Sequence, residues 1–244
     1  MTVDVFFSPS VVDEGAVEGK TAVVIDVIRA TSTVVEALSN GARAIFPTPS
    51  TEEAVKLASS LGREDTLLCG ERKGLKVEGF DLGNSPSEYT ADVVEGKQLV
   101  MSTTNGTRAF ISAEGADRVL AMSFMNLSAV AEALDGVSDL VIVCSGRENR
   151  FSLDDALCAG KLVHLLAERR DEELEFNDGG RVVWDLAAKY SVDAEFLKTT
   201  AAGKNLLSIG LEGDLDICAA VDRHALVPEM KERTIALAPG QDRE

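Results

Sequence analysis

Residues 21–35 read TAVVIDVIRATSTVV, and this stretch decides the fold because it joins an apolar strand, a polar turn and the start of a helix. The run Thr21–Val27 is almost entirely apolar and lacks the polar alternation of a half-exposed strand. Such runs are typical of strands that are buried on both faces of a parallel sheet. We predict further strands of this kind at Ala44–Pro47, Thr66–Cys69, Gln98–Met101, Arg118–Ala121 and Leu140–Cys144.

Helical patterns separate these strands. Residues 51–61 carry apolar side chains at helical spacing, and residues 126–134 repeat the pattern after a capping Asn or Ser. Apolar strands that alternate with helices indicate an α/β fold with a mostly parallel sheet covered on both faces. The helical periods of Val182–Tyr190 and Ala194–Thr200 predict a covering C-terminal layer over about residues 174–238.

The chain also repeats itself. Residues 33–45, TVVEALSNGARAI, and residues 107–119, TRAFISAEGADRV, share a Gly-Ala pair and an apolar rhythm. A weaker echo in the same order pairs residues 68–72 with residues 143–147. We therefore predict a single α/β domain over residues 1–244, with an internal duplicated βαβ repeat whose halves span about 21–96 and 97–167.

The chain of 244 residues is strongly acidic, with 41 Asp and Glu against 24 Lys and Arg and a net charge of −17. Electrostatic repulsion therefore argues against nucleic acid and anionic membranes as partners, and a small molecule is the expected ligand. The first residues lack a basic segment, and no apolar run approaches the roughly 18 residues of a membrane helix. We expect a cytoplasmic protein, with a homodimer as the default assembly.

Arginines, hydroxyl-bearing residues and glycines follow four of the predicted strands. In open α/β sheets, ligands bind beyond the carboxyl ends of the strands, where helix N-termini expose N–H groups to anions. A Thr or Ser there is also a common N-cap, and any one arginine can simply pair with a surface carboxylate. Four arginines together indicate a multiply charged anion. The predicted binding residues are Arg29, Thr31, Ser32, Arg72, Thr104, Asn105, Gly106, Thr107, Arg108, Ser145, Gly146 and Arg147.

Carboxylates accompany these residues. Asp26 and Glu71 follow buried strands, and Asp154 and Asp155 open a predicted helix over Leu153–Leu166. An Asp at a helix start is usually a cap or a partner of the helix dipole, whereas Asp26 interrupts an apolar run. Hard oxygen ligands beside an anion site are what Mg²⁺ needs. We predict that Asp26, Glu71 and Asp155 bind Mg²⁺, and that Asp26 and Asp155 are catalytic.

Four long segments carry a family resemblance: residues 26–33, DVIRATST; residues 70–89, GERKGLKVEGFDLGNSPSEY; residues 102–109, STTNGTRA; and residues 151–160, FSLDDALCAG. In this order and spacing they resemble the 2-phosphosulfolactate phosphatase family of coenzyme M biosynthesis. The resemblance implies a three-layer α/β/α fold, Mg²⁺ dependence and hydrolysis of 2-phospho-3-sulfolactate, or a related phosphorylated 2-hydroxy acid, to sulfolactate and phosphate.

That substrate carries phosphate, carboxylate and sulfonate, which suits several arginines. We expect the phosphate to meet Arg29, Thr31, Ser32 and the loop 104–108. The remote anions are expected to meet Arg72, Arg147 and the loop of Asn84 and Ser85. Two routes stay open, since either Asp26 attacks phosphorus directly or a metal-bound water does so.

Two other interpretations compete with this one. Residues 144–150, CSGRENR, satisfy the pattern Cys-x5-Arg, in which the thiolate of Cys144 would attack phosphate in a cradle closed by Arg150. The four cysteines nevertheless lie in apolar contexts without CxxC pairs, which indicates reduced, buried thiols and no zinc site. A non-catalytic protein that binds anionic metabolites would also use an arginine cluster, but it would gain nothing from adjacent carboxylates unless a metal intervened.

Overall fold

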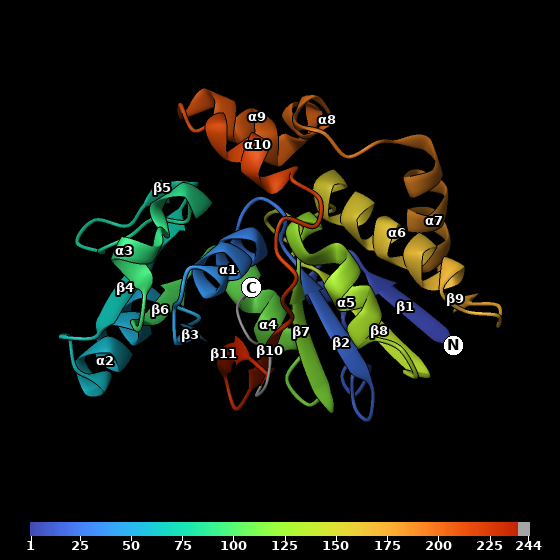
Figure 1. The fold of residues 1–244 in the computed structure, drawn as a ribbon, viewed down its shortest axis with the longest axis horizontal. Coiled ribbons are helices and arrows are strands. Elements are labelled where there is room, and N and C mark those ends of the chain that lie inside the picture. The colour runs from blue at the N-terminus through green and yellow to red at the C-terminus, as the bar shows by residue number, and fades with distance from the viewer. Residues whose placement is uncertain (239–244) are drawn as a thin grey trace.

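The computed structural model describes residues 1–238 and contains one large sheet with helices on both sides (Figure 1). In the described part of the chain the strand order is β5-β4-β6-β3-β11-β10-β7-β2-β8-β1-β9. The strands are β1 Thr2–Phe6, β2 Thr21–Ile25, β3 Ala44–Pro47, β4 Thr66–Arg72, β5 Leu75–Lys76, β6 Gln98–Ser102, β7 Arg118–Met122, β8 Asp139–Cys144, β9 Glu175–Phe176, β10 Pro228–Lys231 and β11 Thr234–Leu237.

Most of the helices connect one strand to the next. They are α1 Ala30–Ser39, α2 Thr51–Leu61, α3 Ala91–Val94, α4 Gly106–Ser112, α5 Leu127–Ala133, α6 Leu153–Glu168, α7 Asp178–Lys189, α8 Ala194–Thr199, α9 Ala201–Ser208 and α10 Gly213–Cys218. Three 3₁₀ turns, η1 Pro9–Val11, η2 Pro86–Glu88 and η3 Phe124–Asn126, join them. None of the helices within residues 1–238 combines the length and the apolar character required to cross a membrane.

Strand β2 shows why the protein has three layers. Its Val23 and Ile25 belong to the core under α5, α6 and α7, whereas Ala22 and Val24 belong to the core under α1 and α4. Successive side chains of a strand point to opposite faces, so an uninterrupted apolar run requires cover on both. The predicted three-layer α/β/α class is therefore confirmed.

The sheet combines two groups of parallel strands. One contains β4, β6 and β3, the other contains β7, β2, β8, β1 and β9, and the antiparallel pair β11 and β10 lies between them. Three antiparallel pairings in a row make β3 and β7 run in opposite directions. The strands predicted from the sequence are all present, but the sequence did not indicate β1 or the β10–β11 hairpin.

The two repeated segments have similar local structures. Residues 33–45 pass from α1 through Gly41 into β3, and residues 107–119 pass from α4 through Gly115 into β7. Both glycines have a positive φ, 97° and 99°, which a residue with a side chain rarely adopts. Common origin by duplication stays a prediction.

The C-terminal segment covers the sheet in two places. Helix α7 packs on α6, and α8, α9 and α10 lie above the central strands at the top of Figure 1. Beyond α10, Arg223 and His224 both contact the carboxylate of Glu36 in α1, at 3.1 and 2.9 Å. Partial burial alone would raise the pKa of Glu36, but hydrogen bonds from His224 and Arg223 and the charge of Arg223 hold it below its usual value.

Candidate active site

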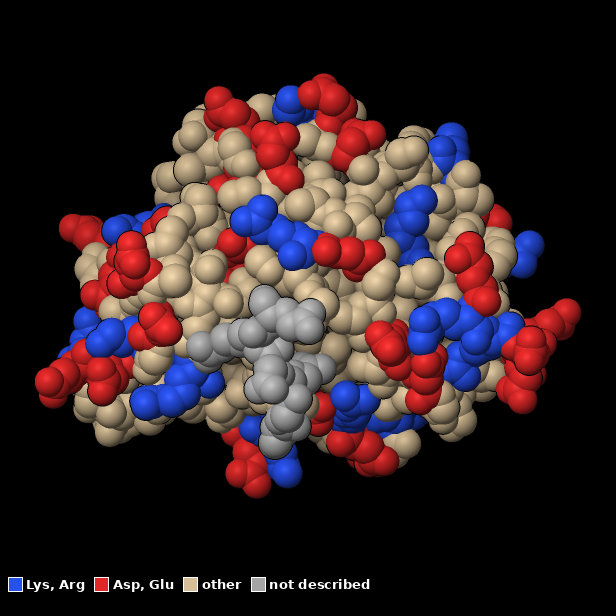
Figure 2. All heavy atoms as spheres, viewed as in Figure 1, with Lys and Arg blue, Asp and Glu red and all other residues tan. Residues whose placement is uncertain are grey.

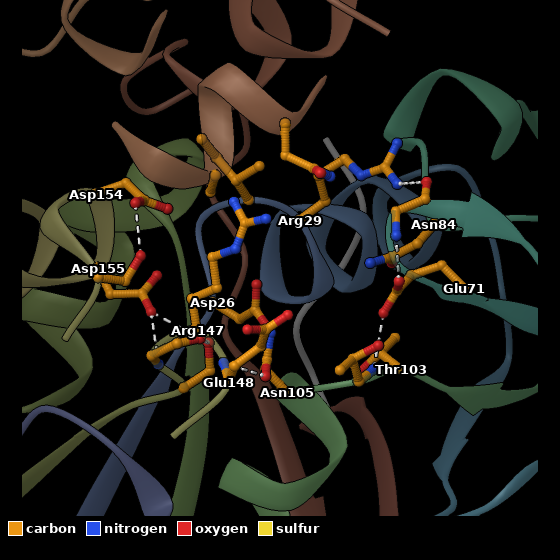
Figure 3. Close-up of a pocket in the computed structure, with 18 of the residues that line it drawn as sticks. Asp26, Arg29, Glu71, Asn84, Thr103, Asn105, Arg147, Glu148, Asp154 and Asp155 are labelled. Carbon is orange, nitrogen blue, oxygen red and sulfur yellow. Dashed lines mark hydrogen bonds between the residues drawn. The ribbon is translucent and has the colours of Figure 1, made fainter. Parts of the chain in front are cut away.

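A pocket of about 210 Å³ lies where the carboxyl ends of β2, β4, β6 and β8 meet, with α9 above it. Figure 3 shows Asp154 and Asp155 on one side, Glu71 and Asn84 on the other, and Asp26 between them. The lining residues are Asp26, Ile28, Arg29, Glu71, Lys73, Gly74, Asn84, Thr103, Thr104, Asn105, Ser145, Gly146, Arg147, Glu148, Ser152, Asp154, Asp155, Ala202, Asn205 and Leu206.

Asp26 occupies the turn between β2 and α1. Its Oδ1 accepts a hydrogen bond from the backbone N–H of Ala30 at 3.1 Å. Thr31 Oγ1 accepts from the Asp26 N–H and donates to the Asp26 carbonyl, while Ser32 Oγ donates to the Val27 carbonyl. Thr31 and Ser32 therefore hold the turn that aims Asp26, and among the described residues neither belongs to the pocket lining.

Asp155 ties three segments together from the first turn of α6. Its Oδ1 accepts from the Val27 N–H at 2.9 Å, and its Oδ2 accepts from the Gly146 N–H at 3.0 Å and from Ser145 Oγ at 3.1 Å. The neighbouring Asp154 accepts a hydrogen bond from Ser152 Oγ at 2.7 Å through Oδ1. Among the other described residues, Ser152 gives the one hydrogen bond recorded to this carboxylate, and Asp154 lines the pocket.

The three aspartates share a strongly perturbed environment. The pKa of Asp26 is raised from 3.8 to about 7, chiefly by burial and also by the charges of Asp154 and Glu71. Burial also raises the pKa of Asp154, and it raises the pKa of Asp155 well above the usual range with help from the charges of Asp154 and Asp26. Clustered buried carboxylates must hold protons or be offset by a cation, and such groups mark functional sites.

Glu71 bridges two loops on the opposite wall. Its Oε2 accepts from the Gly74 N–H and its Oε1 from the Thr104 N–H, both at 2.7 Å. The carboxylate therefore fixes the turn after β4 against the loop after β6.

Two carboxylates of the pocket suit the ligand preferences of Mg²⁺. Within residues 1–238, no group of three or more His, Cys, Asp or Glu side chains has the arrangement of a metal site. Mg²⁺ uses only one or two carboxylates, because waters and phosphate oxygens complete its octahedron. Asp26 and Asp154 fit that requirement, whereas backbone N–H groups already engage both oxygens of Glu71 and Asp155.

The four predicted arginines have different environments. Arg29 lines the pocket but pairs with Asp214 at 2.6 Å. Arg72 donates to the carbonyl groups of Glu71 and Ser102 and to Ser102 Oγ, outside the lining. Arg108 is exposed on α4, also outside the described lining. Arg147 lines the pocket and donates to the Ala201 carbonyl at the start of α9.

The loop after β6 approaches Asp26 closely at Gly106. A Cβ atom on Gly106 would lie 2.8 Å from Asp26 Oδ2 and would also overlap Ala30, so only glycine fits there. Thr107 exchanges hydrogen bonds with Thr103, and Asn105 accepts from the Glu148 N–H. Gly106 and Thr107 are thus structural supports beneath the lining.

Two buried polar atoms in the pocket wall have no protein partner. They are Asn84 Oδ1 and Thr104 Oγ1. Ser85, beside Asn84, instead donates to Asp214 and lies outside the described lining. Buried polar groups almost always find a partner, so these atoms are suited to contact water or a bound ligand.

Cys144 lies in the core beneath the pocket and does not line it within the described residues. Burial raises the pKa of its thiol well above the usual value, and the charge of Asp155 acts in the same direction. A thiol of this kind is not a thiolate at neutral pH, so it is a poor nucleophile.

We expect Cys144→Ser to retain most phosphatase activity, because the thiol has only a packing role. The matched control is Cys158→Ser, which alters an equally buried thiol on α6. Both variants should lose some stability from burying a hydroxyl. A kcat that falls by several orders of magnitude in the folded Cys144 variant alone would establish the Cys-x5-Arg mechanism instead.

The sequence indicated some lining residues only weakly. Asp154 was predicted only to open a helix. Lys73 lies in the segment 70–89, of which other residues were predicted to belong to the site. Asn205 and Ala202 come from α9, where no sequence signal pointed to the pocket. They reach it because the C-terminal helices fold back over the strand ends.

Comparison with known proteins identifies the family of the chain. A profile of the 2-phosphosulpholactate phosphatase family matches residues 6–233. The chain is 42% identical over 231 residues to a Clostridium acetobutylicum protein named "Probable 2-phosphosulfolactate phosphatase", covering 94% of this chain and 97% of the relative. Relatives with the same name come from Thermotoga petrophila, at 43% identity over 93% and 95% of the two chains, and from Symbiobacterium thermophilum, at 40% over 90% and 94%. The prediction of an enzyme of the phosphatase class is confirmed, and the chain belongs to the 2-phosphosulpholactate phosphatase family.

Proposed function

We propose that this pocket hydrolyses the phosphate ester of 2-phospho-3-sulfolactate, or of a closely related phosphorylated 2-hydroxy acid, in an Mg²⁺-dependent reaction. The observation that carries the proposal is the cluster of buried aspartates with raised pKa values at the strand ends, in a chain of this family. An anionic substrate would not bind beside these carboxylates unless a cation offset their charge.

Asp26 and Asp154 are the proposed metal ligands, with Asp155 and Glu71 holding the surrounding loops. A bound Mg²⁺ would offset charge on the phosphate and on both carboxylates. This assignment keeps Asp26 from the predicted set and adds Asp154. It removes Glu71 and Asp155, whose oxygens already accept backbone N–H groups.

The remaining chemistry belongs to the chain itself. A carboxylate beside the attacking water can take its proton, and Asp26 is the proposed base. Its pKa of about 7 belongs to the metal-free pocket, and a bound cation would lower it and keep the carboxylate ionised. The unpaired Thr104 hydroxyl is placed to donate to water or to a phosphate oxygen, and the unpaired Asn84 Oδ1 to accept from water. Trapping of an aspartyl-phosphate on Asp26 would instead establish direct attack.

The charges around the pocket affect how an ester with three anionic groups reaches it. Figure 2 shows acidic side chains gathered over the helices at the top of the view, α8 to α10 in Figure 1, so the approach is electrostatically unfavourable without local cations. Arg29 is already paired with Asp214. Lys73 lines the pocket, is exposed, and has no ion pair with any described residue. Lys73 and Arg147 are therefore the proposed partners of the remote carboxylate and sulfonate.

We expect Arg147→Ala to raise the KM for 2-phospho-3-sulfolactate by at least about tenfold, the scale of a lost charge-assisted hydrogen bond of about 1.5–3 kcal/mol. Hydrolysis of p-nitrophenyl phosphate, which lacks the remote anions, should hardly change. Steady-state kinetics on both esters measure the contrast.

The matched control is Arg150→Ala, which removes an exposed arginine of the same loop that does not line the pocket within the described residues. It should leave both substrates unaffected. Equal losses for the two substrates in Arg147→Ala would show that Arg147 supports α9 or the phosphate and does not select the remote anions.

A substrate panel tests the proposed function as a whole. The esters are 2-phospho-3-sulfolactate, phospholactate, 2-phosphoglycerate and p-nitrophenyl phosphate, with released phosphate as the readout. The sulfonated ester should have the highest kcat/KM. A preference for the aryl ester would remove the proposed substrate while leaving the enzyme class in place.

A further inference from the structure

A buried ion pair lies at the edge of the pocket and joins residues far apart in the sequence. Arg29 Nη1 contacts Asp214 Oδ2 at 2.6 Å, and the two side chains are only 3% and 4% exposed. Arg29 is the N-cap residue of α1, whereas Asp214 lies in α10. The pair therefore connects the α/β layers to the helices above the pocket.

Further hydrogen bonds extend this pair to two other pocket segments. Arg29 Nη2 donates to the Gly74 carbonyl at 2.6 Å, in the turn that Glu71 also holds. The second oxygen of Asp214 accepts from Ser85 Oγ at 2.5 Å, beside the pocket residue Asn84. One carboxylate thus fixes the direction of Arg29 and the position of the loop that carries Asn84.

The energetics of the pair argue for a role beyond stability. A buried ion pair gains little net stability, because desolvation of both charges offsets their attraction. It can still fix geometry, since a guanidinium with two of its nitrogens bonded cannot rotate freely. Arg29 also lines the pocket, so the orientation of its guanidinium decides where its remaining N–H groups point.

We propose that Asp214 is a positioning residue for hydrolysis, acting through Arg29 and through the Ser85 loop. The proposal rests on the proposed function, with Arg29 as a donor to the phosphoryl group. Asp214 does not touch the substrate. It holds the donors of Arg29 in the direction that the transition state requires, and it links that geometry to the docking of α10.

The test compares Asp214→Asn with the wild-type chain and with Asp216→Asn. The first variant keeps the shape of the side chain and removes its charge, and the control removes the same charge from an exposed site on α10. We expect kcat to fall by about 100-fold in Asp214→Asn, because small misplacements of catalytic donors cost this much. KM should change by less than about threefold, and Asp216→Asn should match the wild type.

A second variant keeps the test valid if Asp214→Asn does not fold. Ser85→Ala removes one contact of Asp214 while leaving Arg29 paired, and we expect kcat to fall by about three- to tenfold, the scale of one hydrogen bond. Thermal unfolding is measured first, and all assays are run where each variant is fully folded. A purely structural Asp214 would lower the melting temperature but leave kcat per folded molecule unchanged.

Two substrates separate this inference from the proposed function. If wild-type protein hydrolyses p-nitrophenyl phosphate but not 2-phospho-3-sulfolactate, the proposed substrate is wrong, and the variants are compared on the aryl ester. Normal kcat in folded Asp214→Asn and in Ser85→Ala would overturn the positioning role. A rise in KM at constant kcat would overturn it as well, because that result would mean uniform binding.

Discussion

Asp26→Asn should lower kcat by about 1,000-fold or more and at the same time stabilise the metal-free protein at pH 8. The loss of activity follows from removing the proposed base and metal ligand, since acid–base groups contribute about 10²–10⁴-fold. The gain in stability follows from the raised pKa of Asp26, because the folded protein has to ionise a buried carboxylate beside Asp154 and Glu71 at this pH. Asn keeps the Oδ1 acceptor that caps Ala30.

The two effects have separate measurements. Phosphate release gives kcat, and chemical denaturation in the presence of a chelator gives the free energy of unfolding. Asp216→Asn serves as the control for removing one negative charge from an acidic protein and should alter neither quantity appreciably. A folded Asp26→Asn with wild-type kcat would remove Asp26 from the mechanism, and a loss of stability would show that Asp26 is mainly a structural cap.

Mg²⁺ should raise the melting temperature by about 5–10 °C at pH 8 when present at about 100 times its Kd, and by much less at pH 5.5. Without metal, the folded state holds a proton on Asp26 that the unfolded chain loses near pH 4. The stability from this group is therefore present below about pH 4 and is lost as the pH rises through about 7. Metal binding needs the ionised carboxylates, so its stabilisation grows over the same interval.

Differential scanning calorimetry with chelator or with Mg²⁺ at both pH values measures this difference. Asp154→Asn should abolish most of the Mg²⁺ shift, whereas Asp216→Asn should retain it. Equal shifts at the two pH values would mean that the metal binds elsewhere. No shift in the wild type at either pH would contradict the proposed metal site.

The buried strands were the most predictable part of the fold. Residues 21–25 and 140–144 are apolar on both faces, so their pattern admits only a sheet covered on two sides, which the structure contains. The β10–β11 hairpin was missed because its turn, Glu232 and Arg233, has no glycine or asparagine. Both residues nevertheless adopt positive φ angles of 49° and 61°.

The sequence predicted where the candidate site lies in the fold, but not which residues contact one another in it. The predicted parallel sheet placed Asp26, Glu71, Ser145 and Arg147 at one edge. All four do line the pocket, although β4, which carries Glu71, runs opposite to β2 and β8. The partner of Arg29 could not be assigned, because Asp214 is 185 residues away and reaches it only through the folding of the C-terminal helices. Thr31 and Ser32 differ, because their hydrogen bonds to Asp26 and Val27 are local, and the N-cap alternative stated from the sequence is closer to the turn-supporting role that the structure shows.

The most direct test of the account measures inorganic phosphate released from 2-phospho-3-sulfolactate by protein that has been stripped of metal with a chelator, before and after Mg²⁺ is added. The account predicts no measurable release from the stripped protein, and full restoration by Mg²⁺ in the wild type but not in Asp26→Asn. Undiminished release in excess chelator would contradict the proposed metal-dependent mechanism.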